Sequence, residues 1–211
     1  MATIAAFLKS VEHMDKDADD EWYMIWTRLS EVDGCAKLRI LVFNEPSDPF
    51  PSVWEIEARG HREVCFKSGR FDQIALESDH PLLWGHTMPT EQLNFIGPPG
   101  PHESLLWRLY ERHRQVVGDY IPFDRHVQSH FIGNRLSGGG GVLAEGPTRL
   151  LREYADVLAG SDLEPYFPYP TRPAVRWDEA RQWVVEDAPL AVLILGESYL
   201  VAEEFSANRE S

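Results

Sequence analysis

Polar and apolar side chains alternate with a period of two through much of the segment between residues 22 and 97. In the stretch Val53–Ala58, acidic side chains alternate with the apolar side chains of Trp54, Ile56 and Ala58. Successive side chains of a strand point to opposite faces, so this alternation is typical of a strand with one buried face. We therefore expect residues 22–97 to form an antiparallel sheet of about five or six strands.

Two short sequences indicate the turns of β-hairpins. Asp33-Gly34 separates two apolar runs, and glycine accepts the positive φ that tight hairpin turns require. Near the C-terminus, residues 196–198 divide another apolar stretch into two runs. The first of them, residues 190–195, is apolar at every position, which predicts burial on both faces beneath helices. We expect this C-terminal hairpin to rejoin a sheet.

Two amphipathic helices are predicted in the middle of the chain. Between Glu103 and Gly118, apolar side chains recur three and four positions apart, which places them on one face of a helix. A second helix is expected over residues 147–160. Pro147 is tolerated at a first helical position, and Gly160 is expected to form a left-handed cap.

These elements together predict an α+β fold, with an antiparallel sheet of about five to seven strands covered by a layer of two or three helices. A chain of 211 residues with 43% hydrophobic content can bury one core, so residues 1–211 are predicted to form a single domain. Within it, residues 1–97 are expected to be mainly strands and residues 98–171 mainly helical with a glycine-rich loop. Residues 172–211 are expected to hold the C-terminal strand hairpin.

The chain is strongly acidic, with 34 Asp and Glu against 20 Lys and Arg. Binding to a nucleic-acid backbone needs basic side chains that displace counterions, so no direct contact of that kind is expected. No apolar stretch approaches the ~20 residues of a membrane span, and the N-terminus lacks the pattern of a secretory signal. Cys35 and Cys65 lack the spacing of a zinc site and are expected to be buried free thiols. We predict a cytoplasmic protein with no membrane contact.

Four consecutive glycines at 138–141 raise the question of an anion-binding loop. Such loops point backbone N–H groups at an anion, commonly with a Lys nearby. Here no Lys follows, Glu145 is negative and Pro147 has no N–H, so a connection between packed elements is favoured. In the anion-binding alternative, the ligand would contact Arg135, Ser137, Gly138 and Gly139.

His126 and His130 are four residues apart and would lie on one face of a helix. A pair of imidazoles at this spacing can bind a metal ion when a carboxylate from elsewhere completes the site. The alternative is a pair of polar or half-buried side chains without a metal. No third ligand is evident from the sequence, so no cofactor is predicted.

Tyr166, Phe167 and Tyr169 lie among prolines in the stretch 164–173. Prolines stiffen this segment, so its rings could be presented to a protein partner at a small entropic cost. The same rings could equally pack over a groove of their own fold.

No catalytic residue is predicted, since the chain lacks a nucleophile elbow and the motifs of nucleotide-binding loops. Acidic residues cluster at 12–21 and again beyond Trp177. We therefore predict a soluble cytoplasmic binding or accessory protein, such as an acidic inhibitor or immunity-type factor for a basic protein partner. The alternative is an enzyme whose site lies around residues 125–141 and acts on a phosphate-containing or metal-activated substrate. The oligomeric state is left open.

Overall fold

The computed structural model describes residues 3–12, 22–32, 34–43, 49–67, 69–98, 103–127, 139–177 and 182–210. Helices and antiparallel strands occur together in these residues, which confirms the α+β class. Contacts divide the chain into two compact units. Unit 1 comprises Met1–His80 and Ala188–Ser211, and unit 2 comprises Pro81–Asp187. The single domain predicted for residues 1–211 stays a prediction.

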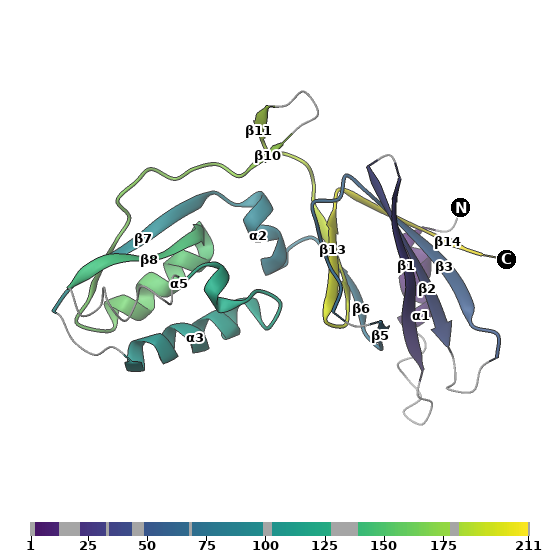
Figure 1. Ribbon diagram of the computed structural model, residues 1–211, viewed down its shortest axis with the longest axis horizontal. Coiled ribbons are helices and arrows are strands. Elements are labelled where there is room, and N and C mark those ends of the chain that lie inside the picture. The colour runs from purple at the N-terminus through teal and green to yellow at the C-terminus, as the bar shows by residue number, and fades with distance from the viewer. Residues whose placement is uncertain are drawn as a thin grey trace. The chain divides into compact units, whose positions relative to one another are not determined.

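The largest sheet of unit 1 has five strands in the order β14-β3-β2-β1-β5 (Figure 1). Gly34, at a φ of 72°, lies in the two-residue turn between β1 and β2, which confirms the predicted hairpin. The alternation predicted along β3 is confirmed as well, because Trp54, Ile56 and Ala58 are buried and the residues between them are not. The strands are β1 (Tyr23–Val32), β2 (Cys35–Phe43), β3 (Ser52–Arg59), β5 (Arg70–Phe71) and β14 (Glu204–Arg209).

A second sheet of unit 1 has four strands in the order β4-β13-β12-β6. Gly196, at a φ of 59°, turns the chain between β12 and β13, and these strands pair with β6 and β4. The C-terminal hairpin therefore rejoins a sheet, as predicted, and side chains on both faces of β12 are buried. The strands are β4 (Glu63–Cys65), β6 (Ile74–Glu77), β12 (Ala191–Leu195) and β13 (Ser198–Ala202).

The prediction of one sheet over residues 22–97 is wrong, because its strands are divided among three sheets. At Gly60, with a φ of 60°, the chain leaves β3. The N–H of Arg62 then donates to the carbonyl of Val201 at 2.8 Å, so β4 pairs with the C-terminal hairpin. Strand β7 belongs to unit 2. A period of two identifies the buried face of a strand but not its neighbour, and the neighbours here are distant in sequence.

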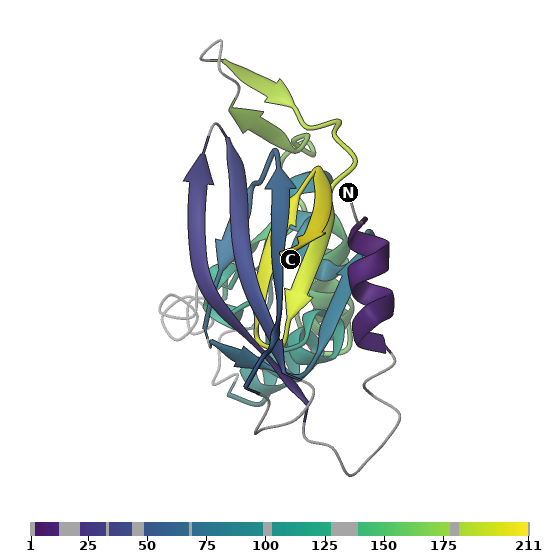
Figure 2. The same ribbon diagram turned by 90° about the vertical axis from the view of Figure 1, so that its right-hand side faces the viewer.

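One face of the five-stranded sheet is buried beneath helix α1 (Ile4–Glu12) and the C-terminal hairpin (Figure 2). Phe7 and Val11 of α1 share a core with the inward side chains of β2 and β3, and the rings of Phe7 and Trp54 lie 5.0 Å apart. Leu193 and Leu200 of the hairpin belong to the same core. The face of β12 that carries Leu193 therefore shares a core with the five-stranded sheet as well as with α1.

Unit 2 contains a three-stranded sheet in the order β8-β7-β9. Helix α5 packs against all three strands and also against α3, so α5 lies between the sheet and α3 (Figure 1). The helices are α2 (Pro81–Thr87), α3 (Glu103–Val117), α5 (Thr148–Ala159) and the 3-10 helix η2 (Phe123–Arg125). The strands are β7 (Thr90–Ile96), β8 (Gly140–Pro147) and β9 (Glu164–Tyr166), with β10 (Val175–Trp177) and β11 (Trp183–Val185) in a separate ribbon.

Both predicted helices are present, at α3 and α5. Gly118 follows α3 with a φ of 66°, as the end of that helix requires. The left-handed cap predicted at Gly160 is wrong, because its φ is −79°. The N–H of Gly160 bonds to Asp156 and that of Ser161 to Leu158, so the chain leaves α5 through a right-handed turn. None of the described helices is long and apolar enough to span a membrane.

The expectation that residues 98–171 are mainly helical missed β8 and β9. The apolar part of β8 pairs with β7, with Leu93 opposite Ala144. Pro147 is therefore the last residue of a strand and precedes the helix. The segment is short and contains three glycines, so its sequence carries little of the alternation from which the other strands were predicted. Cys35 and Cys65 are half-buried free thiols.

We expect Gly34→Ala and Gly196→Ala to lower the free energy of unfolding by different amounts. Both glycines have positive φ, which costs an alanine about 1 kcal/mol or more. A Cβ at Gly34 meets no atom within 4 Å, whereas one at Gly196 lies 3.0 Å from Cβ of Phe71. Urea unfolding should show the larger loss for Gly196→Ala. Gly34→Asn, which tolerates positive φ, is the control and should unfold close to the wild type.

Candidate functional site

The described part of the glycine run is built into the sheet of unit 2. The carbonyl of Gly139 accepts a hydrogen bond from the N–H of Gly97 at 3.0 Å, and Gly140 and Gly141 begin β8. A Cβ at Gly140 would lie 3.1 Å from the carbonyl oxygen of Phe95. Glycine is needed at this position because the neighbouring strand is close. Arg135, Ser137 and Gly138 lie outside the described residues, so anion binding by this loop stays a prediction.

His126 packs against β8. Its Nδ1 lies 3.1 Å from the carbonyl oxygen of Glu145 and therefore acts as the donor, which leaves a lone pair on Nε2 of the neutral ring. Burial lowers the pKa of His126 and favours this neutral form. Gly146 makes room for the ring, since a Cβ there would lie 2.5 Å from Nδ1.

The second histidine of the predicted pair, His130, lies outside the described residues. Within the described part of the chain, no group of three His, Cys, Asp or Glu side chains is arranged to hold a metal ion. Metal binding by His126 and His130 stays a prediction.

The aromatic segment of unit 2 is attached to its own fold by two of its three rings. The guanidinium of Arg152 lies 4.0 Å from the ring centroid of Phe167, a cation–π contact. The hydroxyl of Tyr166 accepts a hydrogen bond from Nδ2 of Asn94 at 3.3 Å. Tyr169 is 63% exposed. Phe167 therefore packs against its own fold, which is one of the two alternatives predicted for these rings. Tyr169 is the ring whose exposure suits contact with a partner.

A buried carboxylate holds the chain that follows these rings. Glu91 on β7 is only 6% exposed, and its Oε2 lies 3.2 Å from Nη2 of Arg152. Its Oε1 accepts a hydrogen bond from the hydroxyl of Thr171 at 2.8 Å. Arg172 exchanges backbone hydrogen bonds with Thr90. The proline-rich segment is thus fixed beside β7 at both of its ends.

Unit 1 contains a groove that the sequence did not predict. It lies between α1 and β6 and has a volume of about 520 Å³. Its apolar lining consists of Leu8, Val11, Trp22, Ile74, Ala75 and Leu76, and its acidic lining consists of Glu12, Asp72 and Glu77. All three acidic side chains are exposed. The groove therefore offers an apolar surface next to negative charge.

Strand β6 is at the edge of its sheet, and all four of its residues line the groove. The N–H of Gly196 donates to the carbonyl of Gln73 at 2.9 Å, so Gln73 directs its backbone groups toward the β12 side of the sheet. In an antiparallel ladder the next residue directs its N–H and C=O to the opposite edge, so those of Ile74 and Leu76 point away from β12. None of the described strands pairs with that edge.

Negative charge is concentrated in the unit that contains the groove. Unit 1 has 20 acidic and 10 basic residues, which gives a net charge of −10. Unit 2 has 14 acidic and 10 basic residues, which gives a net charge of −4. The nine residues 13–21 join Glu12 to Trp22, both of which line the groove, and include five acidic residues and Lys16. The acidic cluster was visible in the sequence, but the position of Glu12 beside β6 was not, because some sixty residues separate the two segments.

The two-stranded ribbon of β10 and β11 exposes a second apolar surface. Val175 lies opposite Val185, and Trp183 is 67% exposed. Residues two apart on a strand share a face, so the exposed side chains of this ribbon lie together. Aromatic and apolar side chains exposed in this manner are frequent at protein interfaces.

A histidine in the core of unit 2 has a structural role. His113 is 1% exposed, and its Nε2 lies 2.7 Å from the carbonyl oxygen of Ile121, to which it donates. Its Nδ1 therefore accepts from the hydroxyl of Tyr154 at 2.6 Å. Burial lowers the pKa of His113 and raises that of Tyr154, so both groups are neutral. With both ring nitrogens bonded, His113 is not available as a general base.

This arrangement predicts that the protein loses stability as the pH falls. The pKa of His113 is lower in the folded chain than its ordinary value near 6.5, so the unfolded chain binds a proton first. The stabilisation is present above about pH 6.5 and decreases below it by up to about 1.4 kcal/mol per pH unit. His80 and His126, whose pKa values burial also lowers, add to the effect. Urea unfolding at about pH 7.5 and 5.5 measures it.

His113→Gln should reduce this pH dependence, since one of the three titrating groups is removed. Tyr154→Phe should lower the free energy of unfolding by about 1–3 kcal/mol, because the buried Nδ1 loses its donor. An unchanged pH dependence in His113→Gln would contradict the assignment.

Comparisons of the chain with models of protein families, with curated proteins and with solved structures find no significant match.

Proposed function

We propose that this chain is a binding protein whose unit 1 accommodates a basic, extended segment of a protein partner in the groove between α1 and β6. Its role would be that of an inhibitor or immunity-type accessory factor for a basic protein. The observation that supports this proposal is the open edge of β6, which lies beside an apolar surface and an acidic rim.

Addition of a strand to a sheet edge explains how such a segment would be held. The outward N–H and C=O groups of Ile74 and Leu76 would pair with the partner's backbone, and these hydrogen bonds do not depend on its sequence. The four residues of β6 correspond to an added strand of about four to six residues at roughly 3.4 Å per residue. A short extended segment is therefore the occupant that fits.

Selection among such segments would come from the side chains around the groove. Alternate residues of an added strand point to opposite sides, so one set could contact Leu8 and Trp22 while the other remained near Asp72 and Glu77. The preferred segment would alternate apolar and basic residues. Long-range attraction by the net charge of −10 on unit 1 would increase the association rate with a cationic partner.

The enzyme alternative around residues 125–141 stays a prediction. Residues 128–138 of that segment lie outside the described residues. Of the described ones, His126, Val127 and Gly139–Gly141 are engaged in packing and strand pairing. No observation on them favours a reaction over the binding function.

The proposal predicts binding of a fluorescein-labelled peptide of about eight residues that alternates Lys and Val, followed by fluorescence anisotropy. Affinity should fall at least tenfold between about 0.1 M and 1 M NaCl, because the Debye length shortens from about 10 Å to 3 Å. The double variant Asp72→Lys, Glu77→Lys should weaken binding by a similar factor. Glu31→Lys, which reverses an exposed acid on β1 outside the groove, is the matched control and should bind like the wild type.

Two further peptides test the geometry. A peptide of alternating Lys and Ser should bind more weakly, because it lacks apolar side chains for the groove. The Lys-Val peptide with N-methyl groups on alternate residues should not bind, because it cannot pair with β6. Equal losses in the double variant and in Glu31→Lys would show a general charge effect and overturn the proposal.

A further inference from the structure

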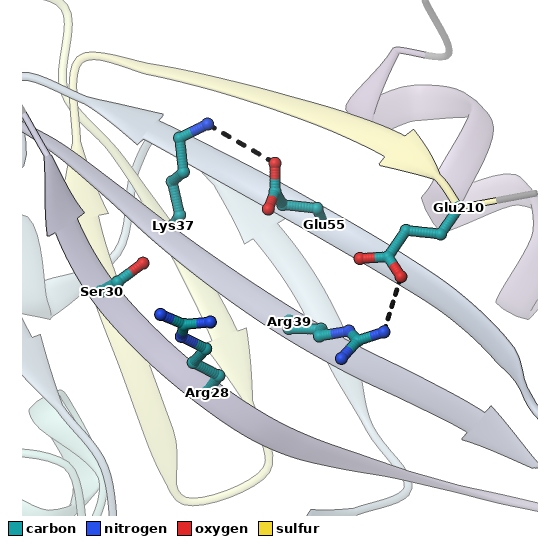
Figure 3. A pocket seen from close by; sticks show the side chains of 6 residues that line it. All are labelled: Arg28, Ser30, Lys37, Arg39, Glu55 and Glu210. Atoms are coloured by element: carbon teal, nitrogen blue, oxygen red, sulfur yellow. Dashed lines mark hydrogen bonds and ion pairs between the residues drawn. The ribbon is translucent and has the colours of Figure 1, made fainter.

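The outer face of the five-stranded sheet in unit 1 has a shallow depression of about 390 Å³. It lies across the middle of the sheet, opposite the face that α1 covers, and three of its six lining side chains are cations (Figure 3). The lining residues are Arg28, Ser30, Lys37, Arg39, Glu55 and Glu210. Such a group of cations is unexpected in a unit with a net charge of −10.

Two of these cations face each other across neighbouring strands. Arg28 on β1 lies directly opposite Arg39 on β2. Like charges at directly opposite positions destabilise a sheet unless another group compensates them. Nη2 of Arg39 lies 2.6 Å from Oε2 of Glu210, so that guanidinium is compensated. Arg28 has no ion pair with any of the described acidic residues.

The remaining cation is also compensated, on the side of β3. Nζ of Lys37 lies 2.6 Å from Oε1 of Glu57 and 3.5 Å from Oε1 of Glu55. Ser30 lies opposite Lys37 on the strand that carries Arg28. The acidic side chains are therefore located over β3 and β14, and the part of the depression over β1 contains a guanidinium and a hydroxyl without an acid.

We propose that this part of the depression binds a small oxyanion, with Arg28 as the principal contact. The guanidinium of Arg28 presents parallel N–H donors that match two oxygens of a carboxylate or a phosphoryl group. Ser30, two residues along the same strand, adds a hydroxyl donor. The bound anion would compensate the charge of Arg28, as Glu210 compensates that of Arg39.

The site is independent of the proposed function. It lies on the outer face of the five-stranded sheet, takes ligands of the opposite sign, and shares no lining residue with the groove beside β6. Either proposal can therefore fail without the other.

The test uses the full chain and two probes, sodium acetate and inorganic phosphate, with chloride added to keep the ionic strength constant. Shifts of the arginine Nε–Hε signals in ¹⁵N-resolved NMR spectra report binding. We expect saturable shifts of the Arg28 signal, identified by its loss in Arg28→Gln. Preference for acetate would indicate a carboxylate ligand, and preference for phosphate a phosphoryl ligand.

Arg28→Gln should weaken binding of the preferred probe at least fivefold, and Ser30→Ala should weaken it to a smaller extent. Arg28→Lys retains the charge but loses the paired donors, so it should fall between Arg28→Gln and the wild type. Arg59→Gln is the matched control, since Arg59 is exposed on β3 but does not line the depression. Linear, non-saturating shifts with both probes, or equal losses in Arg28→Gln and Arg59→Gln, would overturn the proposal.

Discussion

Burial of one face of the five-stranded sheet is the constraint on which the rest of unit 1 depends. Alternate side chains of β2 and β3 enter a core with Phe7 of α1 and Leu193 and Leu200 of the C-terminal hairpin. Because the period of a strand is two, the same burial forces the intervening charged side chains to the opposite face. The hairpin brings β6 with it and leaves β6 at an edge, next to α1. The acidic groove and the charged outer face thus follow from a single packing arrangement.

These two surfaces of unit 1 differ in sign and in construction. The groove combines open backbone groups with apolar and acidic side chains, a combination that suits a polypeptide. The depression on the outer face is lined by charged and hydroxyl side chains and has no apolar lining residue, so it suits a small charged group. The strong net negative charge is relevant to both surfaces, since it would favour the approach of any cationic ligand and makes Arg28 a local exception.

Unit 2 uses polar groups chiefly for internal support. Glu91 holds Arg152 and Thr171, and His113 connects Tyr154 to the backbone near Ile121. Buried polar groups of this kind are hydrogen-bonded to partners. Removal of a partner leaves a buried donor or acceptor unpaired, which lowers the free energy of unfolding. Residues of a type that often acts in catalysis can therefore have a structural role. In this unit, surface exposure, as at Tyr169 and Trp183, is the better indicator of a contact surface.

The sequence by itself determined the local elements of this protein. Gly34 and Gly196 marked hairpins because only a residue tolerant of positive φ turns so tightly, and helical periodicity located α3 and α5. Only the tertiary structure decided which strands are neighbours, since β4 pairs with β13 across more than a hundred residues, and it alone placed α1 beside β6 and Glu210 beside Arg39. Local periodicity reports which side of an element is buried, whereas the burial of the whole unit selects the partners of that element. The groove beside β6 is formed by such distant neighbours, whereas Arg28, Ser30 and Arg39 of the proposed anion site belong to one hairpin.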